Sequence, residues 1–183
     1  MSKKLIVAAL LGLALASGSA IAKNPIVGGA SMFPSKTIVQ NASKAKNLTT
    51  LVAAVGAAGL VETLSGPGPF TVFAPTNAAF SALPAGTVET LLKPENKATL
   101  TKILSCHVVP GKVMASAVIK LVKKGGGKAK VKTVGGCDLT LQVGKGKVHI
   151  TDESGSTAQV TQADVLQSNG VVHVINKVLL PKM

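Results

Sequence analysis

The pattern of apolar residues changes near the middle of the chain, and this change restricts the possible folds more than any other feature. Residues 37–104 carry most of their apolar side chains at helical spacing, between breaks at Gly and Pro. After Ser105 the apolar residues fall into short runs rich in Val and Thr, separated by tight turns such as Gly144-Lys145-Gly146. Helices followed by consecutive strands predict an α+β domain with an antiparallel sheet, because a βαβ repeat would alternate the two.

The first residues have the order of features found in a secretory signal peptide. Two lysines precede the apolar run Leu5–Ala16, which is shorter than the roughly 20 residues of a membrane-spanning helix. Ala20-Ile21-Ala22 then fits a cleavage site after Ala22. We therefore expect a secreted or periplasmic protein without a transmembrane anchor. The expected organisation is a signal peptide at residues 1–22, a flexible lead-in at residues 23–34 and one domain at residues 35–183.

The positive charge of the chain comes from lysine alone. All 20 basic residues are lysines, and the formal net charge is +13. Such a charge favours anionic surfaces or polymers. Base recognition relies on arginine and on aromatic stacking, and the only aromatic residues are four phenylalanines in the first half of the chain. We therefore do not expect nucleic-acid binding.

The densest cluster of positive charge lies in one short segment. Six lysines fall between Lys120 and Lys132, and three of them, Lys123, Lys124 and Lys128, surround a run of three glycines. We interpret this segment as a flexible basic loop. One hypothesis is that it contacts an anionic polysaccharide, lipid headgroups or an acidic protein of the cell surface, matrix or envelope. The alternative is a loop that only increases solubility.

The two cysteines, Cys106 and Cys137, are expected to form a disulfide. A signal peptide directs the chain to a compartment where disulfides persist. A redox pair or a metal site is the alternative, but the sequence has neither a Cys-x-x-Cys motif nor a Cys/His cluster of zinc spacing. For a loop of about 30 residues the bridge is expected to stabilise the fold by roughly 3–4 kcal/mol.

Motifs for catalysis are not found in the sequence. There is no G-x-S-x-G segment and no phosphate-binding P-loop. The only neighbouring acids, Asp152 and Glu153, precede turn-forming residues and are interpreted as part of a solvated hairpin turn. We therefore expect a protein that is not an enzyme and that needs no cofactor or metal.

Three segments, in order, resemble the signature segments of fasciclin domains. They are TVFAPTNAAF at 71–80, HVVPG at 107–111 and NGVVHVINKVLLP at 169–181. The resemblance extends from about Ser35 to Pro181. It implies the fasciclin fold, a seven-stranded β-wedge with a cluster of helices packed beside it. It also implies a non-catalytic role in cell adhesion or in envelope or matrix interaction; the alternative is an extracytoplasmic protein that binds lipid, polysaccharide or a small molecule.

Most residues of these segments are interpreted as structural. Phe73 and Phe80 supply apolar area to the core, and Asn77 is expected to bond local backbone groups at the start of a helix. His107 and His173 are interpreted as hydrogen-bonded core histidines, with a metal or catalytic role as the alternative. The remaining structural motif residues are Pro75, Thr76, Pro110 and Gly170.

Two departures from the family pattern concern recognition. Many members have a tyrosine before the histidine of the middle segment, a pair implicated in adhesion in animal relatives, whereas this chain has Cys106 there. Animal members also carry an Asp-Ile type of integrin-recognition motif before the last segment, and the corresponding residues here are Asp164, Val165 and Leu166. One hypothesis is that these three contact a partner. The alternative is that Asp164 satisfies backbone groups in a turn.

Overall fold

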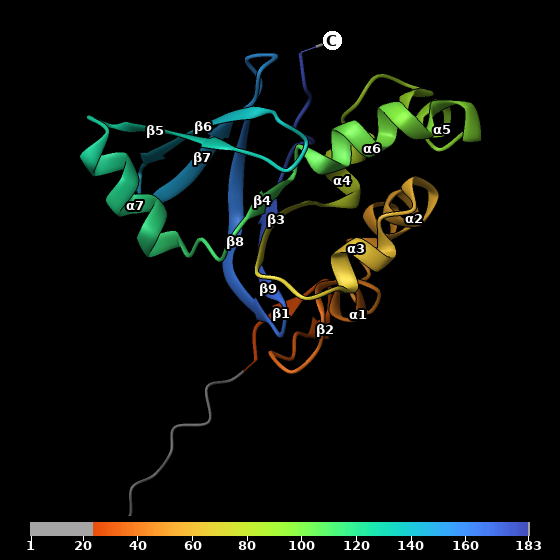
Figure 1. The fold of residues 1–183 in the computed structure, drawn as a ribbon, viewed down its shortest axis with the longest axis horizontal. Coiled ribbons are helices and arrows are strands. Elements are labelled where there is room, and N and C mark those ends of the chain that lie inside the picture. Colours follow the sequence, from red (N-terminus) through yellow and green to blue (C-terminus); the bar gives the residue numbers. More distant parts are fainter. Residues whose placement is uncertain (1–23, 183) are drawn as a thin grey trace, which may run out of the picture.

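The computed structural model describes residues 24–182 and shows a seven-stranded sheet with helices on both of its faces (Figure 1). The expected signal peptide, residues 1–22, lies outside the described residues. Within residues 24–182 no helix is long and apolar enough to cross a membrane. The mixture of a seven-stranded sheet and packed helices confirms the predicted α+β class.

The sheet has the strand order β4-β3-β9-β8-β7-β6-β5. Its strands are β3 (Phe70–Pro75), β4 (Val108–Pro110), β5 (Lys128–Lys132), β6 (Asp138–Gly144), β7 (Lys147–Thr151), β8 (Thr157–Gln167) and β9 (Gly170–Ile175). All neighbours pair antiparallel except β3 and β9, which are parallel. The prediction of a purely antiparallel sheet is wrong at this pair. Both strands are buried along almost their whole length, as is usual for strands with helices on both faces.

Six α-helices and one turn of 3-10 helix precede the strand-rich half. They are α1 (Ile38–Ala42), α2 (Thr49–Ala58), α3 (Val61–Ser65), α4 (Asn77–Ser81), α5 (Thr87–Leu91), η1 (Pro94–Asn96) and α6 (Lys97–Ser105). Four of the six α-helices have five residues. Isolated helices of this length are unstable in water, so these helices depend on the packing around them.

The segment expected to be a flexible lead-in is instead part of the packed structure. Residues Ile26–Val27 (β1) and Ala30–Ser31 (β2) form a small hairpin, and Val27 and Met32 are each only 2 % exposed. The carbonyl of Gly28 accepts a hydrogen bond from the backbone N–H of Lys46. Strands of two residues are too short to produce a visible apolar period, which is why the sequence pattern did not reveal them.

Two groups of buried side chains lie on opposite faces of the sheet. The helical core lies between the sheet and helices α1 to α6, and its members include Ile38, Leu51, Val55, Leu64, Val72, Phe80, Leu104 and Val172. The sheet core lies under the antiparallel strands, and its members include Phe73, Val118, Val122, Leu139, Leu141, Ile150, Val160 and Ile175. Alternate residues of β3 and β9 therefore supply different cores.

A seventh α-helix, α7 (Ala115–Lys124), covers the sheet core (Figure 1). The interpretation of the lysine-rich segment as a flexible basic loop is therefore wrong for Lys120, Lys123 and Lys124, which belong to this helix. Val118 and Val122 lie one helical turn apart and are both buried, and the chain then turns at three glycines directly into strand β5. The turn is closed by a hydrogen bond from the N–H of Gly127 to the carbonyl of Val122.

Candidate functional site

Asn77 joins two helices that are far apart in the sequence. Its Oδ1 accepts the N–H of Thr50 at 3.0 Å, while its Nδ2 donates to the carbonyl of Lys46 and to the hydroxyl of Thr49. It thus caps α2, whereas its own helix is capped by Thr76, which accepts the N–H of Ala79. The prediction of a local role for Asn77 is therefore wrong.

Asn47 lies just before the start of α2, but its side chain does not cap this helix. The capping position is Leu48, and the buried Oδ1 of Asn47 has no hydrogen-bond partner among the described residues. Asn77 supplies the missing acceptor from 27 residues further along the chain.

His107 is a core histidine whose two ring nitrogens are both used. Nδ1 donates to the carbonyl of Ile103 at 2.9 Å, and Nε2 accepts the N–H of Leu179 at 2.9 Å. The ring is 1 % exposed. Burial lowers its pKa to about 4, against smaller opposite effects of the bond to Ile103 and of the charge of Asp152. A neutral histidine in this position is a structural link between α6 and the C-terminal segment.

His173 has the same role on the other face of the sheet. Its Nε2 donates to the carbonyl of Val113 at 2.8 Å, and its Nδ1 accepts the N–H of Asp164 at 3.2 Å. The ring stacks on Phe73, with 5.8 Å between the ring centroids. Burial lowers the pKa of His173, and the carbonyl of Val113 and the charge of Asp164 oppose this effect.

The segment Asp164–Leu166, a candidate for partner contact, is largely used by the fold. Asp164 has a φ of 57° at an irregularity of β8, and its Oδ1 accepts the N–H of Ala115 at 2.7 Å, at the start of α7. Val165 is 1 % exposed and belongs to the helical core, so the hypothesis of a partner contact at this residue is wrong. Leu166, at 37 % exposure, is the most exposed of the three, and Asp164 is partly exposed. The geometry of Asp164 fits the structural alternative.

The six clustered lysines are all exposed, but they do not form a single flat patch. Lys120, Lys123 and Lys124 belong to α7. In β5, Ala129 and Val131 pack against the sheet core under α7, so the three lysines that alternate with them lie on the opposite face of the sheet. We call the six together the lysine rim: Lys120, Lys123, Lys124, Lys128, Lys130 and Lys132.

The position of the rim at the last strand of the sheet has two consequences. Lysines on an edge strand discourage pairing with a second chain, which is a structural reason for Lys128, Lys130 and Lys132. The three lysines nearest the glycine turn, Lys123, Lys124 and Lys128, bring positive charge from both faces to one corner of the molecule. This corner is the part of the rim that a partner can approach from either side.

Cys106 and Cys137 form the expected disulfide, with 5.4 Å between their Cα atoms. Cys106 is the C-terminal cap of α6, and Cys137 directly precedes β6. Both are buried. The bridge therefore joins the end of α6 to the connection between β5 and β6.

The neighbouring acids Asp152 and Glu153 also hold the chain together. Asp152 is 6 % exposed, so the interpretation of a fully solvated turn is wrong for it: one carboxylate oxygen accepts three hydrogen bonds within the turn and the other accepts the N–H of Leu180. Hydrogen bonds from the backbone N–H groups of Asp138 and Lys182 lower the pKa of the exposed Glu153. Among residues 24–182, no three His, Cys, Asp or Glu side chains are grouped to hold a metal ion.

The remaining motif residues have structural positions. Phe73 and Phe80 are buried, Pro75 ends β3 and Pro110 ends β4. A side chain at Gly170 would collide with the carbonyl of Phe70. Sequence reasoning missed Asn169, whose side chain accepts the N–H of Ile38 and donates to the carbonyls of Leu64 and Gly66. The sequence signal that could have identified Asn169 was its position in the last signature segment.

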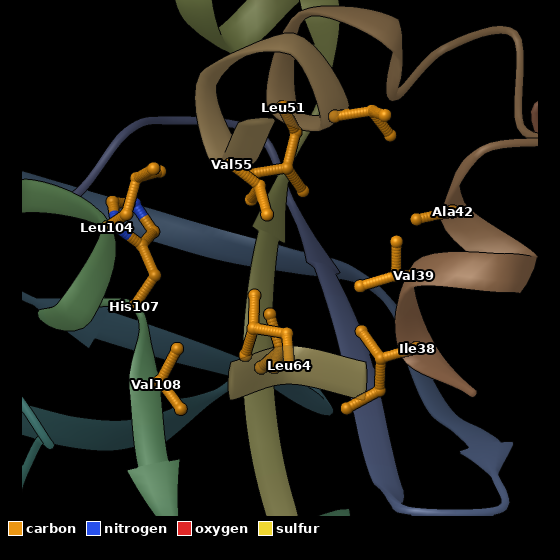
Figure 2. Close-up of a pocket in the computed structure, with 11 residues that line it drawn as sticks. Ile38, Val39, Ala42, Leu51, Val55, Leu64, Leu104, His107 and Val108 are labelled. Atoms are coloured by element: carbon orange, nitrogen blue, oxygen red, sulfur yellow. The ribbon is translucent and has the colours of Figure 1, made fainter. Parts of the chain in front are cut away.

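An apolar cavity of about 30 Å³ lies within the helical core, and Figure 2 shows the side chains around it. Ile38, Val39 and Ala42 of α1 face Leu51 and Val55 of α2 across this space. His107 also lines it, but both of its nitrogens are bonded elsewhere. The cavity holds no polar group that is free to orient a ligand.

Sequence comparisons find several proteins that are similar to this chain. Over 171 residues the chain is 49 % identical to Protein sll1483 of Synechocystis, covering 93 % of this chain and 88 % of that protein. It is 38 % identical to the immunogenic protein MPB70 of Mycobacterium bovis over 76 % of this chain and 66 % of that one. It is 37 % identical to the transforming growth factor-beta-induced protein ig-h3 of Sus scrofa over 81 % of this chain but only 20 % of that much longer protein.

A solved structure has the same fold. The FAS1 domain pair of the insect cell adhesion molecule Fasciclin I superposes with a TM-score of 0.71 at 16 % identity, over 79 % of this chain and 51 % of that one. The Fasciclin domain profile matches residues 46–181, which include all three signature segments. This chain belongs to the fasciclin domain family.

Proposed function

We propose that this protein is a secreted or periplasmic adhesion protein that contacts an anionic component of the envelope, the matrix or a cell surface through its lysine rim. Fasciclin domain proteins are generally non-enzymatic proteins of the adhesion type. The observation that carries the proposal is the corner at which Lys123, Lys124 and Lys128 lie on one helix–turn–strand unit. An anionic polysaccharide or a lipid headgroup is the chemistry that this corner attracts.

The physical basis is attraction between the rim and fixed negative charges. The rim carries six ammonium groups, and no carboxylate occurs in the chain between Glu95 and Asp138. Charges held on one rigid unit lose less conformational freedom on binding than charges on a mobile loop. The contact is therefore expected to be strong at low ionic strength and weak at high ionic strength.

The alternative of a lipid or small-molecule carrier has less support. Sites for such ligands enclose about 300–1000 Å³ of mostly apolar space. The apolar cavity in the described residues has about 30 Å³, and the larger hollows, of about 400 and 260 Å³, are open clefts at the surface with polar residues in their walls. A carrier role would require the helical core to open.

The test is a binding assay with the protein as it is recovered from cells. Binding to whole cells, to acidic polysaccharide and to vesicles with anionic headgroups is measured over a range of salt concentrations for the wild type and for the variant Lys123→Gln/Lys124→Gln/Lys128→Gln. We expect the variant to bind at least about tenfold more weakly at low salt. The difference should shrink as the Debye length falls from about 10 Å at 0.1 M to about 3 Å at 1 M.

A matched control separates the position of the charges from their number. The variant Lys93→Gln/Lys97→Gln/Lys102→Gln removes three exposed lysines around α6 instead. It should keep most of the binding. Equal weakening by both variants would mean that only net charge matters, and unchanged binding by the first variant would refute the role of the rim.

The expected secretion has a separate test. Fractionation of cells, followed by intact-mass measurement, should find a chain that begins at Lys23 outside the cytoplasm. A cytoplasmic chain that retains residues 1–22 would contradict both the processing and the location.

A further inference from the structure

Phe33 is exposed although its backbone is firmly held. Its side chain is 46 % exposed, whereas Phe73 and Phe80 are buried. The buried amide of Asn41 accepts the N–H of Phe33 at 3.1 Å and donates to its carbonyl at 2.8 Å. The same amide also bonds to the side chain of Gln167 in β8. The ring therefore projects from a fixed position, which reduces the entropy that a partner must remove on binding.

Helix α1 presents a polar side next to this ring. Its apolar side, with Ile38, Val39 and Ala42, faces the interior cavity (Figure 2). The other side borders a surface groove of about 260 Å³ between α1 and the β1–β2 hairpin. The exposed groups along the groove are Ser31, Phe33, Lys36, Gln40, Ser43 and Lys44.

These groups combine three kinds of recognition. The phenyl ring offers an apolar face. Lys36 and Lys44 supply two ammonium groups, and no carboxylate lines the groove. The Oε1 of Gln40 accepts the N–H of Thr37, which leaves the NH₂ group of Gln40 as a donor, and the hydroxyl of Ser43 donates to the carbonyl of Gln40 and so can accept from a ligand.

We propose that this groove binds one uronate unit of an acidic polysaccharide. A uronate ring has an apolar C–H face that fits the phenyl ring, hydroxyl groups that fit Gln40 and the serines, and one carboxylate for the two lysines. The inference goes beyond the proposed function, because it assigns a uronate site to a second part of the surface. It uses a different surface from the lysine rim, so either site can fail without the other.

The test is a titration of the protein, as recovered from cells, with trigalacturonate at low salt, followed by calorimetry and by NMR shifts. We expect saturable binding with shifts in α1 and the β1–β2 hairpin. Fully methyl-esterified trigalacturonate, which has the same rings without the charge, should bind at least about tenfold more weakly. Absence of saturable binding, or equal binding of both sugars, would overturn the proposal.

Variants assign the binding to the groove. Phe33→Ala should weaken binding of trigalacturonate at least about tenfold, and so should Lys36→Gln/Lys44→Gln. Ile26→Ala is the matched control, because Ile26 is 54 % exposed on the same hairpin but does not line the groove. Thermal unfolding of each variant checks that the fold is kept. Unchanged binding by Phe33→Ala with an intact fold contradicts the proposal.

Two further outcomes separate this site from its alternatives. The rim variant Lys123→Gln/Lys124→Gln/Lys128→Gln should bind trigalacturonate like the wild type. If this variant loses binding, the sugar binds at the rim and the proposal is overturned. Tighter binding of oligothymidylate than of trigalacturonate would show a nucleic-acid site and overturn the proposal. Suppose that trigalacturonate binds the groove while the rim variant adheres to cells like the wild type. The uronate site is then supported, and the proposed role of the lysine rim in adhesion is refuted.

Discussion

The two cores of this protein are stabilised by different means. The helical core is surrounded by short helices whose starts are held by polar side chains from distant parts of the chain, such as Asn77 and Asn169, and the buried His107 links α6 to the C-terminal segment. The sheet core lies under consecutive antiparallel strands that satisfy one another's backbone, with α7 as its one helix among residues 24–182. The helical half therefore depends on individual side chains, whereas the sheet half depends on its backbone hydrogen bonds.

The largest effect is expected at the buried histidine of the helical half. His107→Ala leaves the N–H of Leu179 without a partner, removes one of the two hydrogen bonds to the carbonyl of Ile103 and enlarges the neighbouring cavity. We expect a loss of about 4 kcal/mol in the free energy of unfolding, measured with urea. His149→Ala, at a half-buried site in the sheet half, is the control and should cost less than about 1 kcal/mol. Similar losses in both variants would contradict the comparison.

The disulfide joins the two halves, so its removal tests how much this link contributes to the free energy of unfolding. Cys106→Ala/Cys137→Ala should lower the free energy of unfolding by roughly 3–4 kcal/mol, since the bridge closes a loop with a sequence separation of 31. Urea unfolding of the oxidised wild type and of the variant measures the difference. A loss below about 1 kcal/mol would mean that the halves are held together by packing alone.

Acid should weaken the fold through the buried histidines. In the unfolded chain an imidazole titrates near pH 6.5, whereas the pKa of folded His107 is about 4, so between these values the unfolded state binds more protons. The full stability is present above pH 6.5, and about 3 kcal/mol should be lost as the pH falls to 4. Burial also lowers the pKa of His173, which adds to the loss in the same direction.

Urea unfolding at a series of pH values checks this slope. The variant His107→Gln is the control, because glutamine has a donor and an acceptor but does not titrate in this range. Its stability should change less between pH 6.5 and 4 than that of the wild type. Identical slopes would show that His107 is not the source of the effect.

Asn77 allows a comparison of a distant cap with a local one. Asn77→Ala removes three hydrogen bonds to the start of α2 and should cost about 2–3 kcal/mol. Thr76→Ala removes one local cap from α4 and should cost about 1 kcal/mol. Thermal and urea unfolding measure both. The reverse order would mean that local capping matters more than the link between helices.

The smallest effect on stability is expected at the lysine rim. Exposed lysines contribute little to folding, so Lys123→Gln/Lys124→Gln/Lys128→Gln should change the free energy of unfolding by less than about 1 kcal/mol. Relief of repulsion in a protein of net charge +13 could make the change favourable. A large loss would show that the rim is part of the framework of the fold.

The sequence predicted the parts of the fold that leave a periodic or local signal. The fold class, most strands, the disulfide and the burial of His107 and His173 were accessible in this way. Helix α7 was missed although Val118 and Val122 have helical spacing, because the surrounding lysines and glycines suggested a loop. The lesson is that a charged segment can still have a buried side.

Contacts between distant residues left no signal that could be interpreted. The partners of Asn77 lie 27 to 31 residues away, and Asn169 bonds to a residue 131 positions earlier. An amide has the same donors and acceptor in every local context, so the sequence alone does not distinguish a turn residue from a link between helices.

Native-state hydrogen exchange of the variant Asn77→Ala tests most directly whether the two halves are stabilised by different means. We expect the amides of α2 to lose protection, because Asn77 fixes the start of that helix. Because Asn77→Ala also lowers the global stability, the amides of β6 and β7 should lose protection only to that extent. Equal loss of protection in α2, β6 and β7, through one common unfolding reaction, would contradict this account.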